Sequence, residues 1–248
     1  MTEKTLKRYL QFLLIVIYVS LTACSENNPV KPQLSVDDLY HNAVLDAMVI
    51  DDDEILPLVE ISPQSPFCTW DSQGRILLIT YHRFPGSYIP NEDYKLIYGE
   101  VWTFTDKEII NWFENNEIGV TDWELRFKQL IGLPPHRDYT HFSALWTNIE
   151  DVVRPAYAWK LSDNFGAKTF IDPPNPEFKT WFDNNILWSY FESAFPWTRL
   201  GYTYDWANNR KKYGLSEFLI KKDATVHVEF TLNTEEFLTW LRSQKIII

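Results

Sequence analysis

The side chain best suited to covalent chemistry is a thiol. Cys68 would act as a nucleophile if a neighbouring base lowered its pKa, and the chain carries five histidines that could supply such a base. No local motif of a known cysteine hydrolase surrounds Cys68. The alternative is that Cys68 is a small buried hydrophobe, which is a common role for an unpaired cysteine.

A second candidate for chemistry is the segment 136–141, which follows a Pro-Pro pair. It places His136, Asp138 and His141 within six residues, and such a group could exchange protons with a substrate. The spacing matches no zinc motif, so we expect no metal ion and no cofactor. The alternative is an ordered polar loop in which the backbone satisfies His141.

Aromatic and polar side chains alternate in the segment 197–206. In an extended strand, the rings of Tyr202, Tyr204 and Trp206 project to one face, and polar side chains project to the other. Aromatic faces of this kind stack on sugar rings and also dominate contacts between proteins. We therefore expect a binding site here, with the candidates Trp197, Arg199, Tyr202, Tyr204, Asp205 and Trp206. Because the chain holds 11 Trp, 13 Tyr and 16 Phe, core packing is the alternative role for these rings.

Two glutamates stand in segments that otherwise read as apolar strands. Glu100 follows Gly99 in a β-rich stretch, and Glu217 lies between Ser216 and Phe218. Two carboxyl groups that face one cleft can act as acid and base on a glycoside. Nothing in the sequence brings these two residues together, so this pair is one hypothesis among several.

The N-terminus reads as an export signal. Lys4, Lys7 and Arg8 precede an apolar run from residue 9 to residue 21, which is too short to cross a bilayer as a helix. The run ends in Leu21-Thr22-Ala23-Cys24. The alternative to a lipid-modified signal is an ordinary signal peptide with an incidental cysteine.

This ending resembles the lipobox of bacterial lipoprotein precursors. The resemblance implies a signal peptide over residues 1–23, cleavage before Cys24, and acyl chains on Cys24 that hold the protein to a membrane. It also implies a lipidated tether over residues 24–34, and Ser25 implies sorting to the outer membrane if the host has two membranes. The expected location is the bacterial cell envelope.

Composition excludes several classes of protein. The 248 residues include 45% hydrophobic ones, which is the proportion of a globular protein and not of a disordered one. The formal net charge of −11 argues against a nucleic-acid partner, because phosphate recognition depends on Lys and Arg. Two cysteines cannot form a disulfide-rich scaffold.

The pattern of apolar residues predicts an α+β fold for residues 35–248. Helices are expected from Ser35, from the capping-box patterns at Thr105 and Thr121, near Pro176 and from Asn233. Strands are expected over 67–70, 75–82, 95–104 and 140–147, followed by a terminal antiparallel set over 198–204, 215–221 and 226–231. We therefore predict a single compact domain, with an antiparallel or mixed sheet and several inserted amphipathic helices.

These observations favour a binding module on the cell envelope, anchored by its N-terminal lipid, that recognises a glycan or a protein partner. One alternative is an envelope hydrolase that uses Cys68 or the His136–His141 segment. Another is a structural envelope lipoprotein without a site for small molecules.

Overall fold

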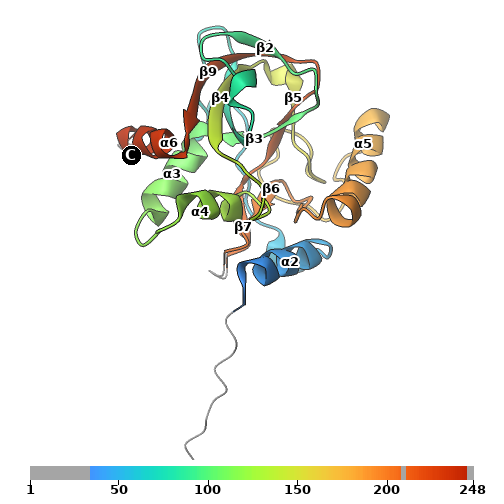
Figure 1. Cartoon of the computed structure of the whole chain (residues 1–248). Coiled ribbons are helices and arrows are strands. Elements are labelled where there is room, and N and C mark those ends of the chain that lie inside the picture. Colours follow the sequence, from blue (N-terminus) through green and yellow to red (C-terminus); the bar gives the residue numbers. More distant parts are fainter. Residues whose placement is uncertain (1–33, 208–210, 245–248) are drawn as a thin grey trace, which may run out of the picture. The chain divides into compact units, whose positions relative to one another are not determined.

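The computed structural model describes residues 34–207 and 211–244 (Figure 1). The expected signal peptide and Cys24 lie outside the described residues. The chain from Ser35 onward forms one compact unit, which confirms the prediction of a single α+β domain. Within the described part, no helix is both long enough and apolar enough to cross a membrane.

A seven-stranded antiparallel sheet forms the centre of this domain. Its spatial order is β2-β9-β4-β1-β3-β8-β5, so strands that are neighbours in the sheet are seldom neighbours in the sequence. A separate pair consists of β6 (Tyr202–Tyr204) and β7 (Tyr213–Ser216). The large sheet contains β1 (Ile76–His82), β2 (Asp93–Lys95), β3 (Val101–Thr105), β4 (His141–Thr147), β5 (Val152–Val153), β8 (Phe218–Ile220) and β9 (Thr225–Asn233).

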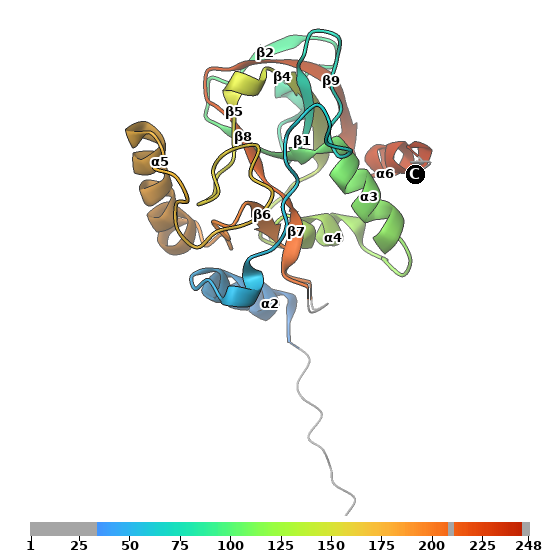
Figure 2. The same cartoon turned by 180° about the vertical axis from the view of Figure 1, so that it is seen from behind.

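Strand β1 is buried along its whole length because both faces of the sheet are covered. Leu77 and Ile79 pack with residues of three helices, whereas Ile76 and Leu78 pack against side chains of β8 and β9. The three helices are α3 (Asp106–Asn116), α4 (Trp123–Leu130) and α6 (Thr234–Ser243), which gather on one side of the molecule in both views (Figures 1 and 2). Helix α5 (Pro176–Leu187) lies on the other side.

The expected helices are all present, although two begin differently from the prediction. Asn233 caps α6 in a full capping box, as its sequence indicates. The capping box expected at Thr105 is wrong, because the Thr105 hydroxyl caps nothing and Glu108 instead accepts hydrogen bonds from the Ser216 N–H. At the next helix, Asp122 is the cap in place of Thr121. The first helix, α2 (Val36–Ala47), begins after Ser35 as expected.

The strand predictions need three corrections. Residues 67–70 form no strand and contribute only an isolated bridge between Trp70 and Ile76. The expected strand 95–104 is two strands, β2 and β3, separated by a loop. The terminal set is right only in part. Segments 198–204 and 215–221 do pair antiparallel, as β6 and β7, but β8 pairs with β3 and β5 while β9 pairs with β2 and β4. The turn at Lys222 and Asp223 is real, but it joins strands that are not neighbours in the sheet.

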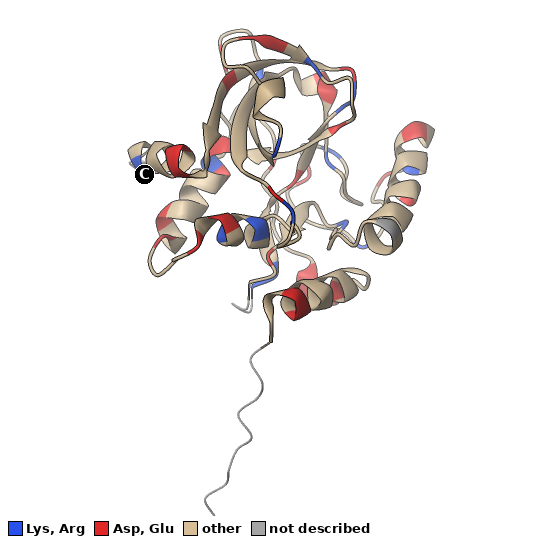
Figure 3. Ribbon diagram, in the orientation of Figure 1, with Lys and Arg blue, Asp and Glu red and all other residues tan. Residues whose placement is uncertain are grey.

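Charged side chains are mixed over the surface of the domain. In the view of Figure 3, Lys and Arg are scattered among Asp and Glu, and acidic residues mark α2 and α5. This mixture agrees with the acidic net charge.

Candidate functional site

A cavity of about 330 Å³ opens where β1 ends and β3 begins. Its walls come from segments far apart in the sequence, which include these two strands, the loop after α4, β6 and the turn between β7 and β8. Ten of the lining residues are aromatic: Tyr81, Phe84, Tyr88, Trp102, Phe104, Tyr139, Trp188, Phe195, Trp197 and Tyr204. The polar lining includes Thr80, His82, Glu100, Arg137, Ser189, Thr198 and Glu217.

Glu217 reaches this cavity because the chain changes sheets at that residue. It is the single residue between β7, in the small sheet, and β8, in the large one. Its N–H donates to the carbonyl of Gly201 at 2.9 Å, which fixes the backbone at the crossing. The side chain is only 8% exposed, and within the described chain its Oε2 has no hydrogen-bond partner.

Burial raises the pKa of Glu217 to about 8, and the neighbouring indole of Trp197 offsets part of this rise. No hydrogen bond of normal geometry joins the two groups, because the Trp197 Nε1 also lacks a partner among the described residues. Unpaired polar atoms are costly in a protein interior and need an explanation. Two of them therefore meet beside one cavity, an indole N–H and a carboxyl oxygen.

The loop that carries Trp197 is held in an unfavourable backbone conformation. Ala194 and Arg199, on either side of Trp197, have φ angles of 53° and 60°. This left-handed region costs residues other than glycine free energy, so the surrounding contacts must enforce it. The Arg199 guanidinium supplies such contacts by donating to the carbonyls of Ala47 and Met48 at 2.9 and 3.0 Å.

Three indoles form a cluster at the cavity, of which Trp102 and Trp197 line it. The ring of Trp102 lies 6.2 Å from both Trp181 and Trp197, and these two lie 6.0 Å apart. The Nε1 of Trp181 donates to Glu100 at 3.1 Å, and Glu100 is exposed. The cluster thus extends from buried Glu217 to exposed Glu100.

The hypothesis of a glutamate pair acting on one glycosidic bond conflicts with the strand register. Thr103 lies opposite Phe218, which places Glu217 level with Phe104. Glu100 precedes Phe104 by four residues, or roughly 13 Å at about 3.3 Å per residue. The two carboxyl groups of a glycosidase lie roughly 5–9.5 Å apart. Both glutamates line the cavity, but at opposite ends of it.

His82 also lines the cavity, and its ring is fully hydrogen-bonded. The Phe84 N–H donates to Nδ1 at 3.1 Å, so Nε2 carries the proton and donates to Ser143 Oγ at 2.7 Å. Ser143 contacts Thr231 Oγ1, which donates to the carbonyl of Tyr88. Burial lowers the pKa of His82 to about 4, helped by the nearby His141. His82 is therefore a neutral structural residue.

The structure divides the aromatic segment 197–206 into two groups. Trp197 and the ring of Tyr204 line the cavity. The other four residues make hydrogen bonds within the protein: Arg199 through one terminal nitrogen as described, although its Nε has no partner in the described chain, the Tyr202 hydroxyl to the Glu54 carbonyl, Asp205 to Arg126, and the Trp206 indole to the Leu133 carbonyl. All six candidates are buried, so they do not form the expected exposed aromatic face.

Cys68 packs in the core and not in this cavity. It is 4% exposed, and its thiol lies 3.7 Å from the carbonyl oxygen of Glu60. Burial raises its pKa, and the nearby carboxylates of Asp106 and Glu108 contribute further. A thiol with a raised pKa is a poor nucleophile.

The residues of the segment 136–141 do not converge on one point. His136 and Asp138 are exposed, whereas His141 is half-buried and contacts the Thr140 hydroxyl at 2.8 Å. The described residues contain no cluster of His, Cys, Asp or Glu that could hold a metal ion. Arg137, from the same segment, does line the cavity and lies over the Phe195 ring.

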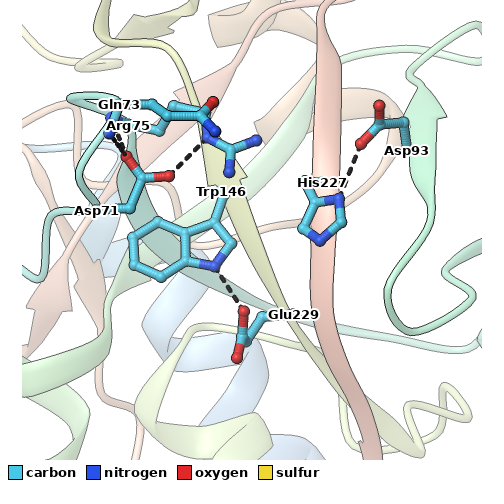
Figure 4. A network of polar contacts seen from close by, with 7 residues as sticks. All are labelled: Asp71, Gln73, Arg75, Asp93, Trp146, His227 and Glu229. Carbon is cyan, nitrogen blue, oxygen red and sulfur yellow. Dashed lines mark hydrogen bonds and ion pairs between the residues drawn. The ribbon is translucent and has the colours of Figure 1, made fainter.

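A larger hollow of about 520 Å³ and a surface network are the other polar groupings. Two ion pairs occupy the hollow: Arg126 binds Asp205 at 2.6 Å, and Lys212 binds Glu54 at 2.9 Å. The network lies on β4, β9 and their surroundings, where the Trp146 indole donates to Glu229 at 2.7 Å (Figure 4). In the same network His227 contacts Asp93, and Arg75 binds Asp71.

Sequence reasoning identified Trp197, Tyr204, Glu100 and Glu217 but missed most of the wall, including Trp188 and Phe195. A glutamate inside an apolar strand was the useful signal for the floor of the cavity, whereas the wall residues carry no local pattern. No protein-family model, curated protein or solved structure matches this chain, so the site itself has to carry the functional argument.

Proposed function

We propose that this protein is a lipid-anchored module of the bacterial cell envelope that binds a small glycan in the cavity around Trp197 and Glu217. The observation that carries the proposal is the pair of buried, unpartnered polar atoms at one aromatic wall. A ligand that supplies their missing hydrogen bonds would remove a cost that the free protein bears.

Sugars fit this combination of surfaces. One face of a pyranose ring is apolar and packs on aromatic rings, while its edge carries hydroxyl and acetamido groups. The cavity offers both kinds of group, with indoles on the wall and two lining residues, Trp197 and Glu217, that each carry a buried polar atom without a partner in the described chain. Its volume of about 330 Å³ lies near the lower end of the range for ligand sites, about 300–1,000 Å³, which suits a monosaccharide or disaccharide.

Binding is better supported than hydrolysis by the residues first considered. Cys68 is buried with a raised pKa, and the segment 136–141 is dispersed. The register of β3 and β8 separates Glu100 from Glu217 along the cavity. These three arrangements favour the binding module over the envelope hydrolase.

The test is a calorimetric titration of full-length protein with disaccharides of the common envelope sugars. A polyoxyethylene detergent keeps the protein in solution without adding competing sugar. We expect Trp197→Phe, which keeps a ring but removes the N–H, to weaken binding about tenfold, the value of roughly one good hydrogen bond.

Trp146→Phe is the matched control, because it removes a surface indole N–H from the same type of pair. It should leave the affinity unchanged. If no sugar binds, or if both variants bind like the original protein, the proposed site is wrong, and the structural lipoprotein becomes the better account.

A further inference from the structure

The floor of the cavity presents two groups without partners, and their chemistry restricts the ligand. The Trp197 indole can only donate a hydrogen bond. Glu217 can donate or accept, depending on whether its carboxyl carries a proton. The protonation state of Glu217 therefore determines which ligand atom the floor recognises.

Three observations indicate that the carboxyl is protonated. The side chain is 8% exposed, and no Lys or Arg of the described chain forms an ion pair with it. The Trp197 indole beside it is neutral and supplies no counter-charge. A carboxyl without a counter-charge in an apolar site keeps its proton at neutral pH and acts as a hydrogen-bond donor.

We propose that the floor of the cavity recognises an acyl oxygen, the carbonyl of an acetamido group on an amino sugar, through two donors: the Trp197 indole N–H and the Glu217 carboxyl O–H. This inference rests on the proposed function and names the sugar class that the site selects. Two neighbouring donors can serve the two lone pairs of one carbonyl oxygen. The acetamido methyl group would lie against the surrounding aromatic rings.

Two other ligand groups compete with this assignment. An ammonium group would need an ionised Glu217. The indole N–H would repel it, because the hydrogen is the positive end of the N–H dipole. A hydroxyl group can accept one of the two donors, but it carries no methyl group for the aromatic wall. The acetamido carbonyl uses both donors without a change of protonation.

Three disaccharides of nearly identical shape separate these alternatives. The test measures the affinity of full-length protein for di-N-acetylchitobiose, for its de-N-acetylated form and for cellobiose, which present acetamido, ammonium and hydroxyl groups. At pH 6.5 we expect the acetylated sugar to bind at least about tenfold more tightly than either relative. Tighter binding of the ammonium form, or equal binding of all three, overturns the inference.

The pH dependence and one substitution identify the donor. Burial raises the pKa of Glu217 to about 8, so affinity for the acetylated sugar should fall about tenfold per pH unit above that value. Glu217→Gln keeps an N–H donor, and it should bind within a few-fold of the original protein and without this fall. Loss of binding in Glu217→Gln with a folded protein would contradict the donor role and indicate an ion pair instead.

The controls separate this inference from the proposed function. The other ionisable groups on the walls remain in Glu217→Gln, namely His82, Glu100, Arg137 and the tyrosines, so any pH effect that survives belongs to them. Glu229→Gln is the matched surface variant and should behave like the original protein. If other glycans bind but none of these three does, the inference fails while the proposed function stands.

Discussion

Glu217 is the residue on which the proposed function depends most. A glutamate in this position cannot be explained by packing, because its carboxyl is buried, has an unsatisfied oxygen and borders a cavity. The other buried glutamate with a raised pKa, Glu108, accepts hydrogen bonds from Ser216 and Tyr213 and is explained by them. This contrast is the reason we propose that Glu217 contacts the ligand.

The raised pKa of Glu217 has a consequence for stability. In the unfolded chain the carboxyl releases its proton near pH 4.5, whereas in the folded protein it keeps the proton up to about pH 8. The folded state therefore binds more protons between these values, and its stability falls as the pH rises through this window. We expect Glu217→Gln to flatten this fall and to raise the melting temperature at pH 8 relative to the original protein. An unchanged difference in melting temperature between pH 5 and pH 8 would contradict the buried, protonated carboxyl.

Cys68 gives a second prediction at this scale. Because burial raises its pKa, alkylation should be slow and should show no inflection below the reference pKa of about 8.5. Cys68→Ala should leave sugar binding unchanged. An inflection of the alkylation rate well below about pH 8.5 would restore the thiol as a candidate nucleophile.

At the scale of elements, the cavity depends on close contact between the small sheet and the end of α4. Gly214, in β7, leaves no room for a side chain, since a Cβ there would lie 2.1 Å from the Leu130 carbonyl oxygen and 2.3 Å from Thr203 Oγ1. Thr203 and its neighbour Tyr204 form part of the cavity wall. Packing at Gly214 therefore sets the position of that wall.

We expect Gly214→Ala to destabilise the domain by about 1–3 kcal/mol, the usual cost of forcing extra atoms into a packed site. Chemical denaturation monitored by tryptophan fluorescence would measure it. Gly86→Ala is the control, because a Cβ at Gly86 meets no atom within 4 Å. Equal stability of the two variants would mean that the sheets are not in the close contact described.

The sequence predicted where the helices lie better than it predicted which strands pair with each other. Amphipathic spacing and caps such as Asn233 are local, so the helices could be located from them. The pairing of β9 with β4 is a contact between distant segments, and a turn at Asp223 suggested a hairpin that does not exist. For the same reason Glu217 could be noticed as unusual, whereas the wall around it could not be assembled from the sequence.

At the scale of the whole molecule, the account joins an acidic domain to a lipid anchor. The full chain has a net charge of −11, and the expected cleavage removes three basic residues and one acidic residue, which leaves −13. Anionic lipid repels such a body, so we propose that the lipid anchor is what holds it at a membrane. The expected lipid site, Cys24, precedes the domain by a short polar segment that reads as a tether.

We expect Cys24→Ser to abolish incorporation of an alkyne-labelled fatty acid and to release the protein from the membrane fraction. Cys68→Ser removes the other cysteine and should leave both properties unchanged. Lipid labelling that persists in Cys24→Ser would refute the lipobox interpretation, whatever the outcome for the cavity.

The most direct test of the central claim is fluorine NMR of full-length protein labelled with 5-fluorotryptophan. Single Trp→Phe variants assign the resonances of Trp197 in the cavity and Trp146 on the surface. With the tightest-binding disaccharide at saturation, the Trp197 resonance should shift and the Trp146 resonance should not. A saturated complex in which the Trp197 resonance does not move would show that the sugar binds elsewhere.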